Sequence, residues 1–192
     1  MTPPSSDRLA VVVRDATAGD MAQVQAIYGY YVTRTAASFE EVPPSVDEMV
    51  QRLRQVTGQG FPFLVADEAG DVLGYAYAGP WRTRSAYRFT CEDSVYVAPH
   101  VIRRGIGSRV LSALIERCTA LGFRQMIGVI GDSANAGSIG LHRRCGFRQE
   151  GVLRGVGLKF GRWVDVVIMH RPLGSPDDPI PAGCAAGPGS VD

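Results

Sequence analysis

The sequence is poor in the residues that build metal centres and disulfide frameworks. Among its 192 residues there are four cysteines and three histidines. Neither type occurs at the close spacings that are typical of zinc sites or of Cys-x-x-Cys motifs. We therefore expect no metal, and we interpret Cys91, Cys118, Cys145 and Cys184 as reduced thiols of a cytoplasmic protein.

Long hydrophobic runs and a strong net charge are also missing. No apolar run approaches the roughly 20 residues that span a bilayer. The polar, proline-rich residues 1–8 lack the charged and apolar segments of a secretory signal. The net charge is only +1, and the sequence shows no basic stripe of the kind that follows a nucleic acid backbone. We therefore expect neither a membrane nor a nucleic acid as a partner.

The composition is that of an ordinary globular protein, with 45% hydrophobic and 20% charged residues. This is enough apolar material for one sizeable core. We expect a single domain over residues 9–173, preceded by a flexible segment of residues 1–8. Residues 174–192 are rich in Pro, Gly, Ala and Asp, a composition that buries little surface and predicts a disordered tail.

Hydrophobic periodicity predicts a mixed order of elements. Possible capping boxes at Thr17–Asp20 and Ser45–Glu48 mark two helix starts. Strands are expected at 9–13, 61–66, 72–78, 89–98, 125–130, 148–160 and 163–172, and helices at 17–34, 45–57, 107–121 and 138–144. This order predicts a layered α/β fold with a mostly antiparallel sheet and one parallel connection across the helix at 107–121.

The segment from Val95 to Ser108 reads as a strand, a short basic turn and the start of an amphipathic helix. Free N–H groups and the positive end of a helix dipole favour an anion at such a place. Gly105 and Gly107 would let the backbone approach that anion closely. A tight turn with a solvated basic face explains the same residues, and short glycine motifs alone do not decide between the two.

The order of elements, together with this turn, resembles the GNAT superfamily of N-acetyltransferases. The superfamily has Gln/Arg-x-x-Gly-x-Gly/Ala between strand and helix, and here the frame runs from Ile102 to Gly107, with Ile at the first position. A second motif of the superfamily is matched by Asn135, Ser138, His142, Gly146 and Phe147. The resemblance implies a GNAT fold, a mixed sheet of about six or seven strands flanked by about four helices.

The resemblance also implies acetyl-CoA as the co-substrate, without a metal. The turn would hold its pyrophosphate, the preceding strand would follow its pantetheine arm, and a backbone N–H of that strand would stabilise the acetyl oxygen. The residues expected to contact the cofactor are Val95, Tyr96, Val97, Arg103, Arg104, Gly105, Ile106, Gly107, Ser108 and Asn135.

Within the superfamily, the segments from Tyr77 to Tyr87 and from Lys159 to Asp165 are similar to those of phosphinothricin N-acetyltransferases. That similarity implies acetylation of the amine of a small amino acid or analogue, of the phosphinothricin, methionine sulfoximine or methionine sulfone type. It also suggests a homodimer.

An amine must lose its proton before it attacks a thioester, so a base is needed. Glu92 is our candidate, because it lies on the strand just before Val95 to Val97, the part that would follow the pantetheine. The other interpretation is an exposed strand carboxylate. The resemblance implies a bulge near Ser94 that would aim this strand's side chains. His142 is the candidate donor to the leaving thiolate, or else a core histidine hydrogen-bonded to backbone.

The acceptor's acidic groups would suit arginine, whose planar fork pairs bidentately with carboxylates. Arg82, Arg84 and Tyr87 match the family's substrate-binding segment, although a solvated basic loop would look the same. Phe39 would add an apolar wall, although a Phe folded onto the core is an equal interpretation.

Two other functions remain open from the sequence. One is a non-catalytic module that binds acyl-CoA as a regulator. The other keeps the chemistry and changes the acceptor to a protein N-terminus, a polyamine or an aminoglycoside. Polycationic acceptors would favour an acidic cleft, whereas the candidate pocket segment carries Arg82 and Arg84.

Overall fold

A computed structural model describes residues 10–174 of the chain. Residues 1–8 and nearly all of 174–192, for which we expected a flexible start and a tail, lie outside these residues. The described strands are β1 Val12–Asp15, β2 Phe63–Glu68, β3 Asp71–Pro80, β4 Thr90–Val97, β5 Gln125–Gly131, β6 Arg148–Lys159 and β7 Arg162–Pro172. The helices are α1 Met21–Arg34, α2 Val46–Gly58, α3 Ile106–Ala120 and α4 Ala136–Arg144.

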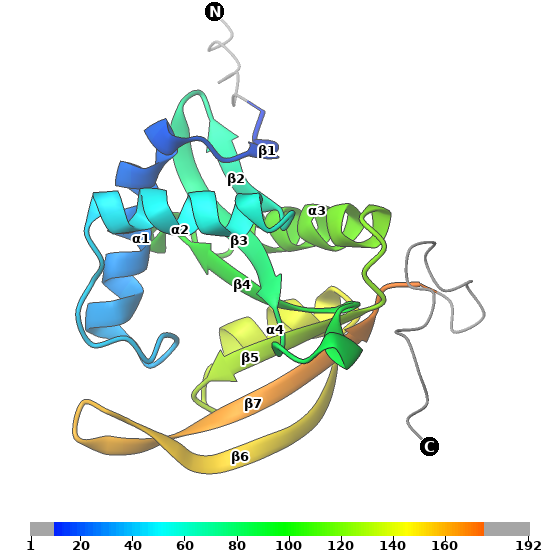
Figure 1. Cartoon of the computed structure of the whole chain (residues 1–192). Helices are drawn as coiled ribbons and strands as arrows, with labels where there is room; N and C mark the ends of the chain where they lie inside the picture. The colour runs from blue at the N-terminus through cyan, green and yellow to red at the C-terminus, as the bar shows by residue number, and fades with distance from the viewer. Residues whose placement is uncertain (1–9, 175–192) are drawn as a thin grey trace, which may run out of the picture.

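The seven described strands form one sheet in the order β1-β2-β3-β4-β5-β7-β6 (Figure 1). Neighbouring strands are antiparallel except β4 and β5, which run parallel and are joined across α3. The predicted layered fold, with its single parallel connection, is confirmed. A parallel pair requires such a crossover because the chain must return to the same end of the sheet.

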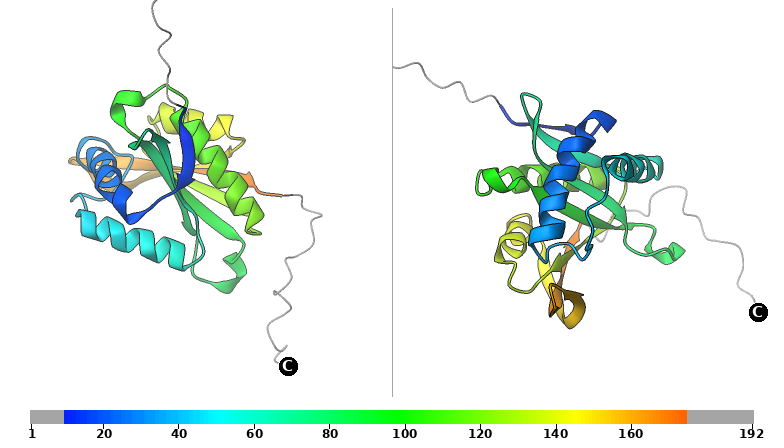
Figure 2. Two further views of the ribbon diagram at one scale, coloured as in Figure 1. Left: turned by 90° about the horizontal axis from the view of Figure 1, so that it is seen from above. Right: turned by 90° about the vertical axis from the view of Figure 1, so that its left-hand side faces the viewer.

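The helices cover the sheet on both sides (Figure 2). On one side α1 and α2 pack on β2 and β3 through residues such as Met21, Met49 and Tyr75. On the other side α3 and α4 pack on the sheet through residues such as Leu111, Leu114 and Ile139. Alternate residues of β2 and β3, such as Leu64 and Val65 or Ala76 and Tyr75, therefore enter two separate cores, as the period of two in a strand requires.

The two predicted capping boxes form, but only one starts its helix where expected. At α2, Ser45 N donates to Glu48 Oε2 at 2.6 Å, and Glu48 N donates to Ser45 Oγ at 3.2 Å. At Thr17 the box instead precedes a 3₁₀ turn, Ala18–Asp20, so that α1 begins only at Met21. The carboxylate of Asp20 is also bound by Arg14 at 2.7 Å, which holds this turn against β1.

The strands β4 and β5 diverge halfway along their length. Their pairing runs from Thr90↔Gln125 to Asp93↔Gly128 and then stops, while β5 stays paired with β7 as far as Gly131 (Figure 1). The pairing of β4 with β3 continues without a register shift. The bulge expected near Ser94 is therefore wrong, and the opening in the sheet comes from β5 following β7 away from β4.

Candidate active site

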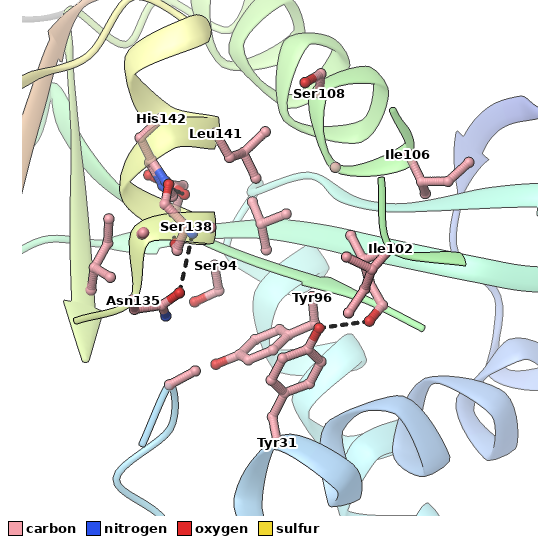
Figure 3. Close-up of a pocket in the computed structure, with 18 of the residues that line it drawn as sticks. Tyr31, Ser94, Tyr96, Ile102, Ile106, Ser108, Asn135, Ser138, Leu141 and His142 are labelled. Carbon is pink, nitrogen blue, oxygen red and sulfur yellow. Dashed lines mark hydrogen bonds and ion pairs between the residues drawn. The ribbon is translucent and has the colours of Figure 1, made fainter. Parts of the chain in front are cut away.

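A cavity of about 540 Å³ lies where β4 and β5 diverge (Figure 3). Its walls come from β4 (residues 93–97), the turn before α3 together with the first residues of α3 (101–103 and 105–108), the end of β5 (129–131) and α4 with its cap (135–138, 141–142 and 144). Tyr31 and Ala37 complete the lining. Segments that are distant in sequence thus meet at the opening between β4 and β5. The cavity contains nearly all of the residues that the sequence assigned to the cofactor.

The turn before α3 is shaped to receive an anion. Arg103 and Gly105 both adopt positive φ angles, of 72° and 80°, and these bring the chain round into the helix. The bond from Arg109 N to Gly105 O, 3.1 Å long, closes the first turn of the helix. The N–H groups of the three residues between them therefore have no partner within the helix and point out of its positive end.

The absence of a side chain at Gly107 lets three elements approach one another. A Cβ at this position would lie 3.1 Å from Leu141 Cδ2 of α4 and 3.4 Å from Val97 Cγ2 of β4. Any larger side chain would enter the space between these elements. The second glycine of the motif therefore keeps the cavity open beside the free N–H groups.

The basic residues of the turn have different environments. Arg103 lines the cavity, whereas Arg104 forms an ion pair with Glu68, with Nη2 2.8 Å from Oε1. Ile102 also lines the cavity and is 54% exposed. Arg144 of α4 adds a cation to the wall that we did not foresee from the sequence.

The strand segment from Ser94 to Val97 is held by aromatic side chains of α1. Tyr31 Oη donates to Val97 O at 2.7 Å. The ring of Tyr96 meets Tyr28 edge-on, with centroids 5.0 Å apart, and burial raises the pKa of the Tyr96 phenol well above its ordinary value. Tyr31 was not foreseen as a residue of this site, since helical spacing does not show which core-facing residues of a helix reach a site.

Asn135 is the N-cap residue of α4. Its Oδ1 accepts from Ser138 N at 3.1 Å, and its Nδ2 donates to Gly131 O at 3.4 Å. It lines the cavity and fixes the start of the helix that carries His142.

Glu92 lies one residue before the part of β4 that lines the cavity. It is half-buried and is paired in register with Gly79 of β3. A Cβ added at Gly79 would have no atom within 4 Å, so the space above this glycine is open. Burial, followed by the negative charge of Asp93, raises the pKa of Glu92 to about 7, while Arg82 acts to lower it. Open space therefore adjoins a carboxyl group that titrates near neutrality.

His142 is buried in α4, and both of its ring nitrogens are engaged. Nδ1 lies 2.8 Å from Ser138 O, and Nε2 lies 3.0 Å from Asp93 Oδ2. The backbone bond of the core-histidine interpretation is present, yet the ring also lines the cavity. We did not foresee Asp93 as the partner of His142. The sequence did contain a signal for it, because Asp93 alternates with Cys91 and Val95 on the core-facing side of the strand.

The four residues predicted for the acceptor do not form one cluster in this chain. Phe39 packs against Gly131 and Gly157, at the far end of β5. Arg82, which stacks on Trp81 at 5.0 Å, lies with Arg84 and Tyr87 in the exposed segment before β4. Lys159 donates to Ser38 O and so fixes the loop that carries Phe39.

The described residues lack the features of a metal site and of a membrane span. Within residues 10–174, no group of three or more His, Cys, Asp or Glu side chains is placed to hold a metal ion. In the same part of the chain, no helix is long and apolar enough to cross a membrane.

Comparison with known proteins agrees with this architecture. Residues 13–168 match the family model of the acetyltransferase (GNAT) domain. The chain is 51% identical over 174 residues to a phosphinothricin N-acetyltransferase of Alcaligenes faecalis, covering 91% of this chain and 88% of that protein. It is 43% identical over 166 residues to an L-methionine sulfoximine/L-methionine sulfone acetyltransferase of Pseudomonas aeruginosa, covering 86% and 96% of the two chains.

A solved structure shows the same fold with the cofactor bound. It is a GNAT superfamily phosphinothricin acetyltransferase from Sinorhizobium meliloti in complex with acetyl-CoA, and it superposes with a TM-score of 0.86 at 47% identity, covering 90% of this chain and 94% of that chain. The glycine turn, the divergent strands and these matches together show that the chain belongs to the GNAT superfamily of N-acetyltransferases.

Proposed function

We propose that this N-acetyltransferase transfers the acetyl group of acetyl-CoA to the amine of a small amino acid or analogue, of the phosphinothricin, methionine sulfoximine or methionine sulfone type. The names of the relatives at 51% and 43% identity support this acceptor class. The observation that carries the proposal is the environment of Glu92: open space adjoins its carboxyl group, and its pKa is raised to about 7.

The cavity fits acetyl-CoA by the chemistry of its walls. The free N–H groups of the turn and the side chain of Arg103 suit a pyrophosphate. Beyond Asp93, the edge of β4 that faces the cavity has no partner in β5, so its backbone groups are available to the pantetheine arm and to the acetyl oxygen. When bound, acetyl-CoA supplies an acetyl group activated as a thioester.

Glu92 is suited to take the proton of the amine. An α-amine has an ordinary pKa of about 8, and a base is most effective when its own pKa lies near the working pH. A carboxyl with a pKa of about 7 meets that condition better than an ordinary glutamate. Arg82 lies close enough to lower this pKa and would orient the acceptor's carboxylate over Glu92.

The release of free thiol from acetyl-CoA tests the proposal directly. Methionine sulfone or phosphinothricin should yield thiol well above the background rate, and the rate should rise with pH through about 7 as Glu92 ionises. Glu92→Gln should lower kcat by roughly 10²–10⁴-fold while acetyl-CoA still binds. Glu116→Gln, at an exposed glutamate of α3, is the matched control and should leave the rate unchanged.

Two outcomes would contradict the proposal. If neither amino acid yields thiol while a polyamine, an aminoglycoside or an N-terminal peptide does, the acceptor class is wrong. If acetyl-CoA binds but no amine is acetylated, the chain acts as a binding module.

We further propose that the protein is a homodimer. The β6–β7 hairpin exposes five large apolar side chains: Leu153 at 51%, Val156 at 55%, Leu158 at 58%, Phe160 at 57% and Trp163 at 69%. Such a patch is unusual on a monomer and is typical of an interface. Sedimentation equilibrium should give twice the mass of the chain, and a monomer at micromolar concentration would refute the proposal.

A cytoplasmic location is the third part of the proposal. Cys91, Cys118 and Cys145 are buried and unpaired with one another, which suits a compartment that keeps thiols reduced. Fractionation of expressing cells should place the activity with the cytoplasmic fraction, and recovery from another compartment would contradict this.

A further inference from the structure

Asp93 of β4 and His142 of α4 form the most deeply buried ion pair of the described residues. Their side chains are 1% and 4% exposed, and His142 Nε2 lies 3.0 Å from Asp93 Oδ2. Burying a charge is costly unless a partner compensates it. A pair placed this deep, 49 residues apart in sequence, therefore requires a specific arrangement of both elements.

The hydrogen bonds of the ring indicate which protonation state it holds. Nδ1 faces the carbonyl oxygen of Ser138 at 2.8 Å, and a carbonyl only accepts, so Nδ1 carries a proton. Nε2 faces the carboxylate of Asp93. An ionised carboxylate also only accepts, so Nε2 carries a proton as well and the ring is an imidazolium. Burial acts to lower the pKa of His142, but the hydrogen bond and charge of Asp93, together with the Ser138 carbonyl, outweigh it and raise the pKa.

The surroundings leave the ring little room to turn. A Cβ at Gly128 of β5 would lie 2.9 Å from His142 Cδ2 and 3.2 Å from Asp93 Oδ1. Phe147 meets the ring edge-on, with centroids 5.0 Å apart and planes at 79°. The imidazole is therefore enclosed by β5, Phe147 and its own helix, and Asp93 fixes its remaining nitrogen.

Other charged groups near this part of α4 do not favour a cation on the ring. Arg144 lines the same cavity, and Arg171 of β7 donates to Cys145 O next to the helix end. Both are cations, and the β5 residue that lies against the ring is the uncharged Gly128. Glu92 neighbours Asp93 in sequence but lies on the opposite phase of β4. The carboxylate that can sustain the charge is therefore Asp93.

Asp93 has a second feature that a purely structural partner would not need. Its Oδ1 is buried without a hydrogen-bond partner among the described groups, and Asp93 and His142 both line the cavity. A half-satisfied buried carboxylate is costly. The pair thus maintains a fixed charge arrangement in the wall of the site.

We propose that Asp93 is a positioning residue, which holds His142 as an imidazolium in the wall of the acetyl-CoA cavity. The inference rests on the proposed function, and it assigns different roles to the two candidates. Glu92 takes the proton of the amine, whereas His142 keeps both of its protons and stabilises negative charge that develops in the cavity. Asp93 acts only through His142.

Titration of His142 by NMR, in the protein without any substrate, tests the first half. The chain has three histidines, so His100→Gln and His170→Gln assign the ring signals. In the wild type, His142 should titrate above the ordinary histidine value. Asp93→Asn keeps the shape and removes the charge, so the midpoint should fall by roughly one to two units. An unchanged midpoint would overturn the proposal.

A double-mutant cycle tests the second half. Asp93→Asn and His142→Gln should each lower kcat by about tenfold, with little change in the KM for acetyl-CoA. The double variant should be no slower than the His142→Gln variant alone, because coupled residues are not additive. Multiplied effects would show that Asp93 acts independently of His142, which overturns the proposal.

A third variant disturbs the pair without removing either of its members. Gly128→Ala leaves both charges in place and pushes the ring and the carboxylate apart, so it should also lower the His142 midpoint; an unchanged midpoint would count against the proposal. Because the titration needs no acceptor, failure of every amino acid as substrate would refute the proposed function and leave the NMR test of Asp93 intact.

Discussion

The two ends of β4 are built from different material. At its carboxyl end, the cavity proposed for the cofactor is made mostly by backbone and by missing side chains, namely the N–H groups of the turn, the left-handed Gly105 and the open position at Gly107. At its amino end, the region proposed for the acceptor consists of the exposed side chains of Arg82, Arg84 and Tyr87. The geometry of a site made of backbone groups is set by the fold, whereas the geometry of a site made of side chains depends on the contacts of each side chain.

The contrast predicts that the largest single effect on cofactor binding comes from adding atoms. Gly107→Val places a branched side chain where a Cβ alone would already lie 3.1 Å from Leu141 Cδ2. We expect acetyl-CoA to bind roughly 100-fold more weakly by calorimetry, a loss of about 2.7 kcal/mol. Gly58→Ala, beside which a Cβ meets nothing within 4 Å, is the control. Unchanged affinity in the Gly107 variant would place the cofactor elsewhere.

At the acceptor end the contrast predicts smaller effects that come from removing charge. Arg82→Ala and Arg84→Ala should each raise the KM of the amino acid by about tenfold, the value of one exposed charge-assisted contact. Acetyl-CoA binding should not change. Arg82→Ala should also move the acidic limb of the rate profile to higher pH, because Arg82 lowers the pKa of Glu92.

Arg148→Ala, at a side chain that is 74% exposed, is the matched control for these variants. A rise in the KM of the amino acid with Arg148→Ala would mean that net charge, and not this segment, recruits the acceptor.

The sequence predicted best those elements whose signals are local. The strand at 125–130 was observed at Gln125–Gly131, and the Ser45–Glu48 box caps α2 as predicted. Both depend on residues within one turn or one strand of each other. The turn at Gly105 is local in the same way, and its positive φ matches the glycine at that position.

The sequence could not predict contacts that arise from tertiary packing. The pairing of Asp93 with His142 joins β4 to α4, and neither residue is marked by its own neighbours as a partner of the other. The resemblance implied a bulge near Ser94, and nothing in the sequence indicated the opening between β4 and β5, because the path of β5 is set by its pairing with β7. Helical spacing likewise cannot show that Tyr31 reaches Val97.

Between the two ends lies Glu92, whose burial predicts a pH effect on stability. Its pKa is raised from 4.5 to about 7 in the folded protein. The folded state therefore binds the extra proton between these values, and this contribution is lost as pH rises through about 7. Glu92→Gln should match the wild type near pH 5. Near pH 8 it should be more stable by roughly 1–2 kcal/mol, once solvent screening of a half-buried carboxyl is allowed for.

Urea unfolding at both pH values measures this difference. Glu116→Gln serves again as the control. Its difference in unfolding free energy from the wild type should be the same at both pH values. If the difference in unfolding free energy between Glu92→Gln and the wild type is the same at pH 5 and pH 8, Glu92 is not desolvated in the folded protein. The argument that its pKa suits a base would then fail.

The smallest expected effect is on acetyl-CoA affinity and comes from a side chain in the turn before α3. Ile102 stands where the superfamily has Gln or Arg, and it is 54% exposed on the cavity wall. Ile102→Arg should tighten acetyl-CoA binding by about two- to fivefold, since an exposed cation gains roughly 0.5–1 kcal/mol. Leu121→Arg, at a position 52% exposed beyond the other end of α3, adds the same charge away from the turn. Equal tightening in both variants would indicate long-range attraction, and no tightening in either would indicate that the backbone N–H groups and Arg103 already satisfy the anion.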